Sequence, residues 1–134
     1  MLYPKRVKHK KLQKGRTKGI DRKATALAFG NIGLKSLGTH WIKSSQIEAA
    51  RRVILRHLKG KGKIWIRIFP DKPVTFIGDE VGMGGGKGSV SHYVYPIKPG
   101  RIVFEIDGVP KEIARAALKE TEKKLPIKTT IIES

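Results

Sequence analysis

The first 23 residues carry so much positive charge that they cannot fold around a core of their own. They contain ten Lys and Arg residues with few apolar residues between them, and Gly15 and Gly19 interrupt any regular element. Because such a segment has no apolar face to bury, it becomes ordered only when a polyanion neutralises it. We therefore predict an extended basic arm over residues 1–23 that binds nucleic acid, with a solvated tail that has no partner as the alternative. Its predicted phosphate contacts are Lys5, Arg6, Lys8, Lys10, Lys11, Lys14, Arg16, Lys18, Arg22 and Lys23.

The excess of positive charge extends beyond this arm and restricts the class of partner. Residues 1–63 hold 18 basic and two acidic residues, whereas residues 64–134 hold 11 basic and nine acidic residues, and the whole chain has a net charge of +18. A charge of this size indicates a polyanionic partner, and nucleic acid is favoured over an anionic membrane surface.

Other features of the composition indicate the compartment. The chain contains no Cys, which excludes disulfides, thiolate metal sites and a Cys nucleophile and is typical of a reducing compartment. No apolar run approaches the roughly 20 residues that span a bilayer, and the N-terminal residues lead into lysines instead of a signal core. We expect a cytoplasmic protein with no membrane partner. An organellar transit peptide is the less favoured alternative, because the segment is not rich in Ser.

Two segments have the periodicity of amphipathic helices. Ser45-Gln46-Ile47-Glu48 has the form of a capping box, and apolar residues follow it at helical spacing, which predicts a helix over residues 45–58. A second helix is predicted over residues 111–125, with Pro110 at its first position. Its expected inward-facing residues are Ile113, Ala117 and Leu118.

The remaining regular segments are predicted to be strands. Lys63–Phe69 alternates strictly, with three isoleucines on one face and Trp65, Arg67 and Phe69 on the other. Residues 90–97 and 101–107 are expected to form a hairpin around a Pro99-Gly100 turn. Further strands are expected at two places in residues 24–42, at 74–77 and at 127–132, with a turn at 70–73 and a glycine-rich loop at 78–89. Together these elements predict a single α+β domain over residues 24–134, with two helices packed on a mainly antiparallel sheet.

The glycine-rich loop does not match the known nucleotide-binding loops. A P-loop needs a glycine five residues before its Gly-Lys pair and Ser or Thr after the Lys, but this chain has Val81 and Gly88 there. The pattern Gly-x-Gly-x-x-Gly, started at Gly82, meets Lys87 in place of its last glycine. We interpret the segment as a cationic loop that lies against a nucleic-acid backbone, with a plain connection as the alternative.

Neither catalysis nor a cofactor is predicted. The four His residues lack the spacing of a metal site, and the few acidic residues form no convincing acid–base pair. We therefore predict no enzymatic activity, no metal and no cofactor.

Two further groups of side chains are candidates for nucleic-acid contact. Arg52, Arg56 and Lys59 follow one another at i, i+4 and i+7 on the predicted helix, away from its apolar residues. Arg67 is difficult to bury unpaired, so it is expected to face RNA. Its neighbours Trp65 and Phe69 are interpreted mainly as packing residues, with an RNA-stacking surface as the alternative.

An ordered series of motifs resembles a known family. The motifs are Pro4-Lys5-Arg6, Lys14-Gly15-Arg16-Thr17-Lys18-Gly19, Phe29-Gly30, Trp41-Ile42, Gln46-Ile47-Glu48-Ala49-Ala50-Arg51-Arg52, the block from Gly62 to Thr75, Met83-Gly84, Gly86-Lys87-Gly88, Lys98-Pro99-Gly100, Asp107-Gly108-Val109-Pro110 and Leu125-Pro126-Ile127-Lys128-Thr129. Nearly from end to end, the chain resembles the ribosomal protein L-sixteen family of the bacterial and organellar large subunit.

The resemblance implies a structural role in the ribosome of the cytoplasm or of an organelle, and a fold of the α/β hammerhead type. It implies binding to large-subunit rRNA of the 23S type, to neighbouring large-subunit proteins, and to tRNA in the aminoacyl site near the peptidyl-transferase region. By resemblance, the rRNA contacts are the arm residues with Arg51, Arg52 and Arg56. The loop near tRNA is Met83, Gly84, Gly85, Gly86, Lys87 and Gly88, with Gly82 where the family commonly has arginine. A free-standing basic DNA- or RNA-binding protein is the alternative function.

Overall fold

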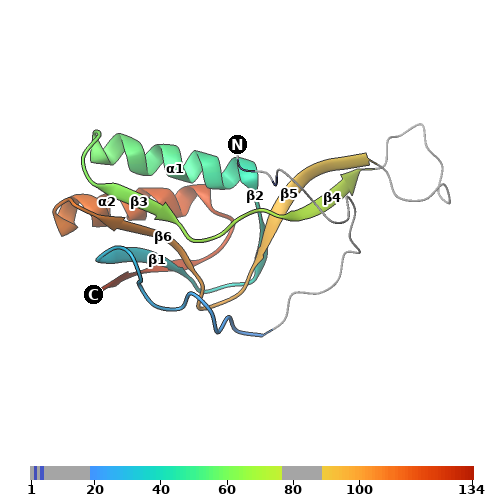
Figure 1. Ribbon diagram of the computed structural model, residues 1–134, viewed down its shortest axis with the longest axis horizontal. Helices are drawn as coiled ribbons and strands as arrows, with labels where there is room; N and C mark the ends of the chain where they lie inside the picture. The colour runs from blue at the N-terminus through green and yellow to red at the C-terminus, as the bar shows by residue number, and fades with distance from the viewer. Residues whose placement is uncertain (1, 3, 5–18, 77–88) are drawn as a thin grey trace.

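The computed structural model describes residues 2, 4, 19–76 and 89–134 of the chain. Its helices are α1 (Ser44–Leu58), α2 (Lys111–Thr121) and the short 3-10 helix η1 (Glu122–Lys124). Its strands are β1 (Ile32–Ser36), β2 (His40–Lys43), β3 (Lys63–Ile66), β4 (Lys72–Phe76), β5 (Ser89–Ile97), β6 (Ile102–Asp107) and β7 (Thr129–Glu133). The helices α1 and α2 lie side by side against the strands (Figure 1), which confirms the predicted α+β fold.

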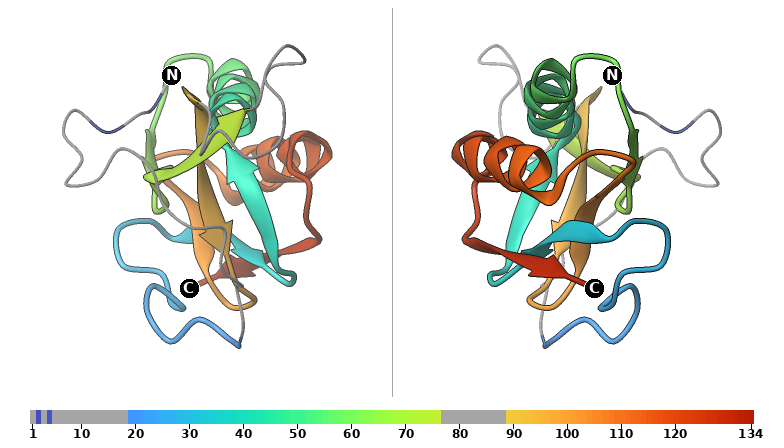
Figure 2. Two further views of the ribbon diagram at one scale, coloured as in Figure 1. Left: turned by 90° about the vertical axis from the view of Figure 1, so that its right-hand side faces the viewer. Right: turned by 90° about the vertical axis from the view of Figure 1, so that its left-hand side faces the viewer.

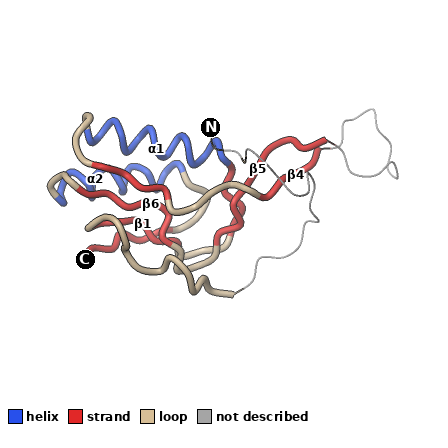
Figure 3. The backbone as a smooth tube through the Cα atoms, viewed as in Figure 1, coloured by secondary structure: helices blue, strands red, loops and turns tan. Residues whose placement is uncertain are grey.

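The strands form two antiparallel sheets. The first has the order β3-β6-β1-β7, and the second has the order β2-β5-β4. Both helices lie on the same side of the sheet that contains β1 and β7 (Figure 2). Strands β4 and β5 of the second sheet form a ribbon that extends away from the helices (Figure 3).

One hydrophobic core fills the space between the helices and the first sheet. The core residues Ile32 and Leu34 alternate along β1, whereas β6 is buried on both of its faces from Ile102 to Ile106. The sheet contributes Ile32, Leu34, Phe104 and Ile106, α1 contributes Ile47, Ala50, Ile54 and Leu58, and α2 contributes Ala114, Ala117 and Leu118. The core therefore fixes which face of α1 is left for solvent or a partner.

Helix α1 has almost the predicted bounds, but its N-terminal cap is different. Ser45 lies inside the helix, and the cap residue is Lys43, whose backbone N–H donates to Gln46 Oε1 at 2.9 Å. The predicted Ser45–Glu48 capping box is therefore wrong, and the Glu48 side chain is free to pair with arginines instead. At the other end, Lys59 adopts a left-handed conformation with φ 51° and its N–H donates to Leu55 O at 3.1 Å, which ends the helix.

The predicted hairpin of residues 90–97 and 101–107 is wrong in its pairing. The turn is present, with Gly100 at φ +97° and Arg101 N–H donating to Lys98 O at 3.5 Å. However, β5 pairs with β2 and β4, whereas β6 pairs with β1 and β3. A strand has two edges for hydrogen bonding, and since both edges of β5 and of β6 are occupied, the two strands belong to different sheets.

Helix α2 confirms two of the three predicted core residues. Ala117 and Leu118 are buried, but the Ile113 side chain is 43% exposed, so its predicted inward position is wrong. Pro110 was predicted at the first helical position, but it is the N-terminal cap residue. The predicted end at residue 125 is also wrong, because α2 ends at Thr121 and η1 continues the chain to the core residue Leu125.

Two strands differ from their predicted limits. Strand β3 ends at Ile66, although Arg67 N–H still donates to Val103 O at 2.9 Å. Strand β4 begins at Lys72 within the predicted turn and includes Pro73, which is tolerated because β4 is an edge strand.

Two predicted segments lie mostly outside the described residues. These are the basic arm up to Lys18 and the glycine-rich loop from residue 78 to residue 88. Ser89, which was predicted to end that loop, is instead the first residue of β5 and pairs with Phe76. Within the described ranges, no helix is long and apolar enough to cross a membrane.

Candidate nucleic-acid interface

Exposed cations on α1 and at its C-terminal cap form a ridge, which we define as Arg52, Arg56 and Lys59. All three side chains are exposed, because the helix buries Ile47, Ala50, Ile54 and Leu58 on its other side. Among the residues that the structure describes, Arg56 and Lys59 have no ion-pair partner. Arg52 and Arg56 therefore lie one turn apart on a rigid helix, and Lys59 follows at its C-terminal cap.

Arg51 and Arg52 differ in how strongly they are held by the protein. Arg51 is bound at both ends of its guanidinium to Glu48, with Nη2–Oε1 at 2.6 Å and Nε–Oε2 at 3.1 Å. These bonds, with the charges of Arg51 and Arg52, lower the pKa of Glu48 from 4.5 to about 2. The same bonds, with the charge of Glu48, raise the pKa of Arg51. Arg52 reaches the same carboxylate at 3.4 Å but keeps a side chain that is 73% exposed. Arg52 is thus the more available of the two for an external anion.

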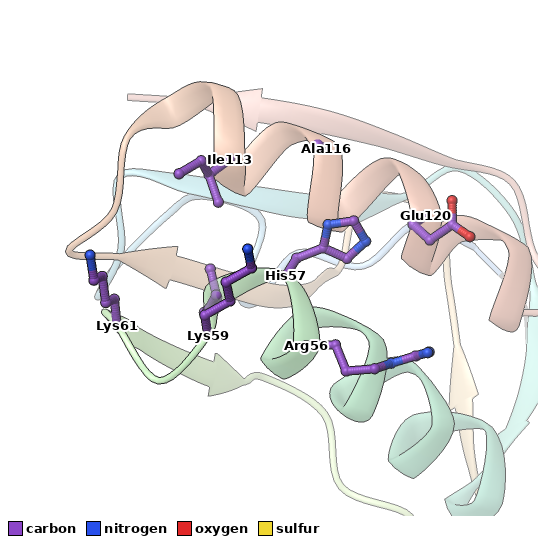
Figure 4. Close-up of a pocket in the computed structure, with 8 residues that line it drawn as sticks. Arg56, His57, Lys59, Lys61, Ile113, Ala116 and Glu120 are labelled. Carbon is purple, nitrogen blue, oxygen red and sulfur yellow. The ribbon is translucent and has the colours of Figure 1, made fainter.

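The end of the ridge borders a groove between the two helices. The groove has a volume of about 490 Å³. Arg56 and His57 come from α1 and Ile113, Ala116 and Glu120 from α2, while Lys59 and Lys61 lie in the turn after α1 (Figure 4). Since three permanent cations face one carboxylate here, the groove extends the positive surface of the ridge towards α2.

Arg67 has an internal partner that sequence analysis did not anticipate. Its guanidinium Nη1 donates to Glu105 Oε2, and its side chain is 18% exposed, whereas Glu105 is fully buried. The premise that Arg67 lacks a partner is therefore wrong, and contact between Arg67 and RNA remains a prediction. Its backbone carbonyl accepts a further bond from Arg101 Nη2 at 2.9 Å.

Glu105 joins this arginine to a segment that is distant in sequence. Its Oε1 accepts hydrogen bonds from the backbone N–H groups of Ala28, Phe29 and Gly30, each at 2.9 Å. Burial raises the pKa of Glu105, but these bonds and the bond from Arg67 lower it by more, so the net pKa lies below its ordinary value. The Glu105 carboxylate is thus held ionised, and its hydrogen bonds join residues 28–30 to Arg67.

The aromatic residues near Arg67 do not behave as simple core residues. Trp65 is only partly buried and stacks on Phe29, with ring centroids 5.9 Å apart and an angle of 19° between the ring planes. Phe69 is 43% exposed, so the interpretation of Phe69 as a packing residue is wrong. The sequence analysis gave neither Phe29 nor Glu105 a role of its own. The available signal was a carboxylate inside the apolar strand Ile102–Ile106, which must find partners when buried.

The described end of the predicted arm is attached to the folded domain. Asp21 N–H donates to Pro99 O at 2.9 Å, and Asp21 Oδ2 lies 3.5 Å from Arg101 Nη1. Arg22 and Lys23 next to this anchor are exposed. The other predicted arm contacts, from Lys5 to Lys18, and the loop residues Met83 to Gly88 lie outside the described residues.

The ribbon of β4 and β5 determines where the glycine-rich segment leaves the domain. Phe76 and Ser89, which flank that segment, pair with each other at the end of the ribbon farthest from the helices (Figure 1). The ridge and this ribbon end are therefore separate surfaces of the molecule.

The described part of the chain, residues 2, 4, 19–76 and 89–134, has no cluster of three or more His, Asp or Glu residues that could hold a metal ion.

Comparison with known protein families gives a match over nearly the whole chain. The family model described as Ribosomal protein L16p/L10e matches residues 4–132. This match confirms the resemblance that the sequence motifs indicated.

Proposed function

Because the chain belongs to the ribosomal protein L16p/L10e family, it is a structural constituent of the large ribosomal subunit, and we propose that it binds 23S-type rRNA through two basic surfaces. These surfaces are the arm of residues 1–23 and the ridge of Arg52, Arg56 and Lys59, with Arg51 beside the ridge. As a member of this family the chain associates with rRNA and with other ribosomal proteins, and the family is structural rather than enzymatic.

The ridge is the observation that carries this proposal. Because the opposite face of α1 is packed into the core, the backbone that carries these cations is already ordered before phosphates bind. Arg is well suited to this contact because its planar guanidinium can bind a phosphate through two parallel hydrogen bonds.

The charge distribution supports RNA over a protein partner for this surface. Lys61 in the turn after α1 is exposed and lines the same groove as Arg56 and Lys59, and Lys63 at the start of the next strand is also exposed. Neutralising phosphates with such cations releases counterions, which makes RNA binding strongly dependent on salt. Family membership also favours this reading over a free-standing DNA- or RNA-binding protein.

The experiment is a salt titration of rRNA binding with matched charge variants. Arg52→Gln with Arg56→Gln should lower the slope of log K against log salt by roughly one to two, since each phosphate contact adds about 0.7 to 0.9. Lys119→Gln with Lys124→Gln removes the same charge from exposed positions near the end of α2 and should leave the slope nearly unchanged. Equal slopes for the two double variants would show that net charge, and not the ridge, determines binding.

We further propose that the glycine-rich residues Met83, Gly84, Gly85, Gly86, Lys87 and Gly88 act towards tRNA in the aminoacyl site. The support is the β4–β5 ribbon, whose far end holds Phe76 and Ser89 on either side of this segment and away from the ridge. Lys87 supplies a cation, and the glycines leave backbone N–H groups accessible to an anion.

A further inference from the structure

Phe29 has a large apolar side chain and remains 55% exposed, although an aromatic ring and a guanidinium group both contact it. Trp65 stacks on it at 5.9 Å, and the Arg67 guanidinium carbon lies 5.0 Å from its ring centroid. Trp65 and Arg67 are two residues apart on an extended segment, so their side chains project to the same side. Both contacts therefore reach Phe29 from that segment, and slightly more than half of the Phe29 residue stays exposed.

The backbone that carries Phe29 is held in place. Three successive N–H groups, those of Ala28, Phe29 and Gly30, donate to the fully buried Glu105 carboxylate at 2.9 Å. A Cβ atom at Gly30 would lie 2.6 Å from Ile106 O, so the segment rests directly on β6. The same carboxylate also binds Arg67. Ring, guanidinium and backbone are thus fixed together before any partner arrives, which reduces the entropy lost on binding.

Phe29 and Trp65 also form one wall of a groove. The groove has a volume of about 610 Å³ and is lined by Phe29, Gly62, Lys63, Trp65, Asp107 and Gly108. Gly62 and Gly108 touch each other closely, since a Cβ at Gly108 would lie 2.9 Å from the Gly62 Cα. This part of the lining is therefore bare backbone, which leaves room beside the aromatic wall.

The polar groups around the groove suit a nucleotide better than an apolar peptide. Lys63 is exposed and supplies a cation for a phosphate. Asp107 Oδ1 accepts the Gly108 N–H at 2.8 Å, which leaves its second oxygen as an acceptor for base amino groups. A flat base stacks on an aromatic ring whatever its sequence, and such contacts are how single-stranded RNA is held.

We propose that the exposed part of the Phe29 ring, with Trp65 and Lys63, is a stacking site for one unpaired nucleobase of RNA. This inference rests on the proposed function, because both require that the protein binds RNA. The stacking contact would distinguish unpaired from paired bases, because a base inside a duplex has both of its faces covered by its neighbours. Phosphate contacts alone cannot make this distinction.

The test compares single-stranded and double-stranded RNA with the full-length protein. The probes are a ten-nucleotide oligoadenylate and a ten-base-pair RNA duplex, and the readout is the ratio of variant to wild-type affinity for each probe. Phe29→Leu keeps an apolar side chain but removes the ring, and should weaken oligoadenylate binding by roughly 5- to 150-fold, the range found for loss of one stacked base. Duplex binding should change less than about twofold, and Phe29→Tyr should bind both probes as the wild type does.

A fluorescence measurement keeps the proposal testable if Phe29→Leu does not fold. The chain has two tryptophans, so Trp41→Phe leaves Trp65 as the reporter. In this variant oligoadenylate should quench Trp65 emission, and the RNA duplex should leave it nearly unchanged.

The outcomes separate this inference from the proposed function. If both probes bind with strong salt dependence but Phe29→Leu affects them equally or not at all, or if Trp65 is not quenched, the stacking site is wrong and the proposed function stands. If wild-type protein binds neither probe nor rRNA, both are wrong.

Discussion

Replacing the buried Glu105 by Gln should destabilise the fold strongly, although the two side chains have nearly the same shape. The wild-type carboxylate accepts four hydrogen bonds, three from backbone N–H groups and one from Arg67. In Glu105→Gln the amide oxygen can still accept hydrogen bonds from residues 28–30. The amide NH₂ then faces the Arg67 guanidinium, and because both groups are donors they cannot form a hydrogen bond. The variant therefore loses the ion pair and leaves a largely buried cation without a counter-charge.

The size of the effect follows from these contacts. Breaking a buried ion pair by removing one partner costs about 3–5 kcal/mol. Arg67 is 18% exposed, so water can hydrate part of its guanidinium, and we expect a loss near the lower end, about 3 kcal/mol. For a domain of this size that loss lowers the melting temperature by roughly 10 °C.

Urea unfolding followed by circular dichroism measures this loss directly. The matched control is Glu133→Gln, because Glu133 pairs with Lys111 and Arg115 at the surface, where solvent screens the charges, and it should unfold close to the wild type. Adding Arg67→Met to Glu105→Gln should restore part of the stability, since no unpaired buried charge is then left. A loss below about 1 kcal/mol in Glu105→Gln, or no recovery in the double variant, would refute the role assigned to this ion pair.

Three further predictions concern other parts of the chain. The folded-state pKa of Glu48 is about 2 and lies below its ordinary value of 4.5, so its pairing with Arg51 stabilises the fold above pH 4.5 and is lost as the pH falls towards 2. Acid titration of stability should show a shallower decline in that window for Glu48→Gln, and identical curves would contradict the pairing. Gly30→Ala should destabilise the fold by about 1–3 kcal/mol in thermal unfolding, because its Cβ would lie 2.6 Å from Ile106 O. An unchanged stability would contradict this prediction, since it would mean that the β6 backbone can move away from the added Cβ without cost. Deleting Gly84–Gly88 should leave the stability of the protein and its amount in purified ribosomes nearly unchanged, because shortening a loop alters closure entropy little. The deletion should weaken the binding of aminoacyl-tRNA to those ribosomes. Loss of the protein from the ribosomes would instead show that the segment is needed for assembly.

Local patterns in the sequence were enough to predict the elements that depend on near neighbours. Helix α1 and its cationic ridge follow from residues three and four apart, and the structure places Arg52 and Arg56 on the exposed side of the helix and Lys59 at its cap. The Pro99-Gly100 turn is likewise a property of two adjacent residues, because Gly can adopt the positive φ that the turn requires. The ordered motifs also identified the family, since they run along nearly the whole chain.

Tertiary structure decided how these elements combine, because strand pairing and burial depend on residues that are far apart in the chain. The sequence alone does not tell which edges of β5 and β6 are already occupied, so the expected hairpin became two sheets. Glu105 meets Arg67 across 38 residues and Phe29 across 76 residues, distances at which no periodic pattern extends. A buried carboxylate must satisfy its charge wherever donors are available, and the fold supplied them from the segment of Phe29. The cationic ridge was therefore readable from the sequence, whereas the exposed aromatic site exists because the fold brings three distant segments together.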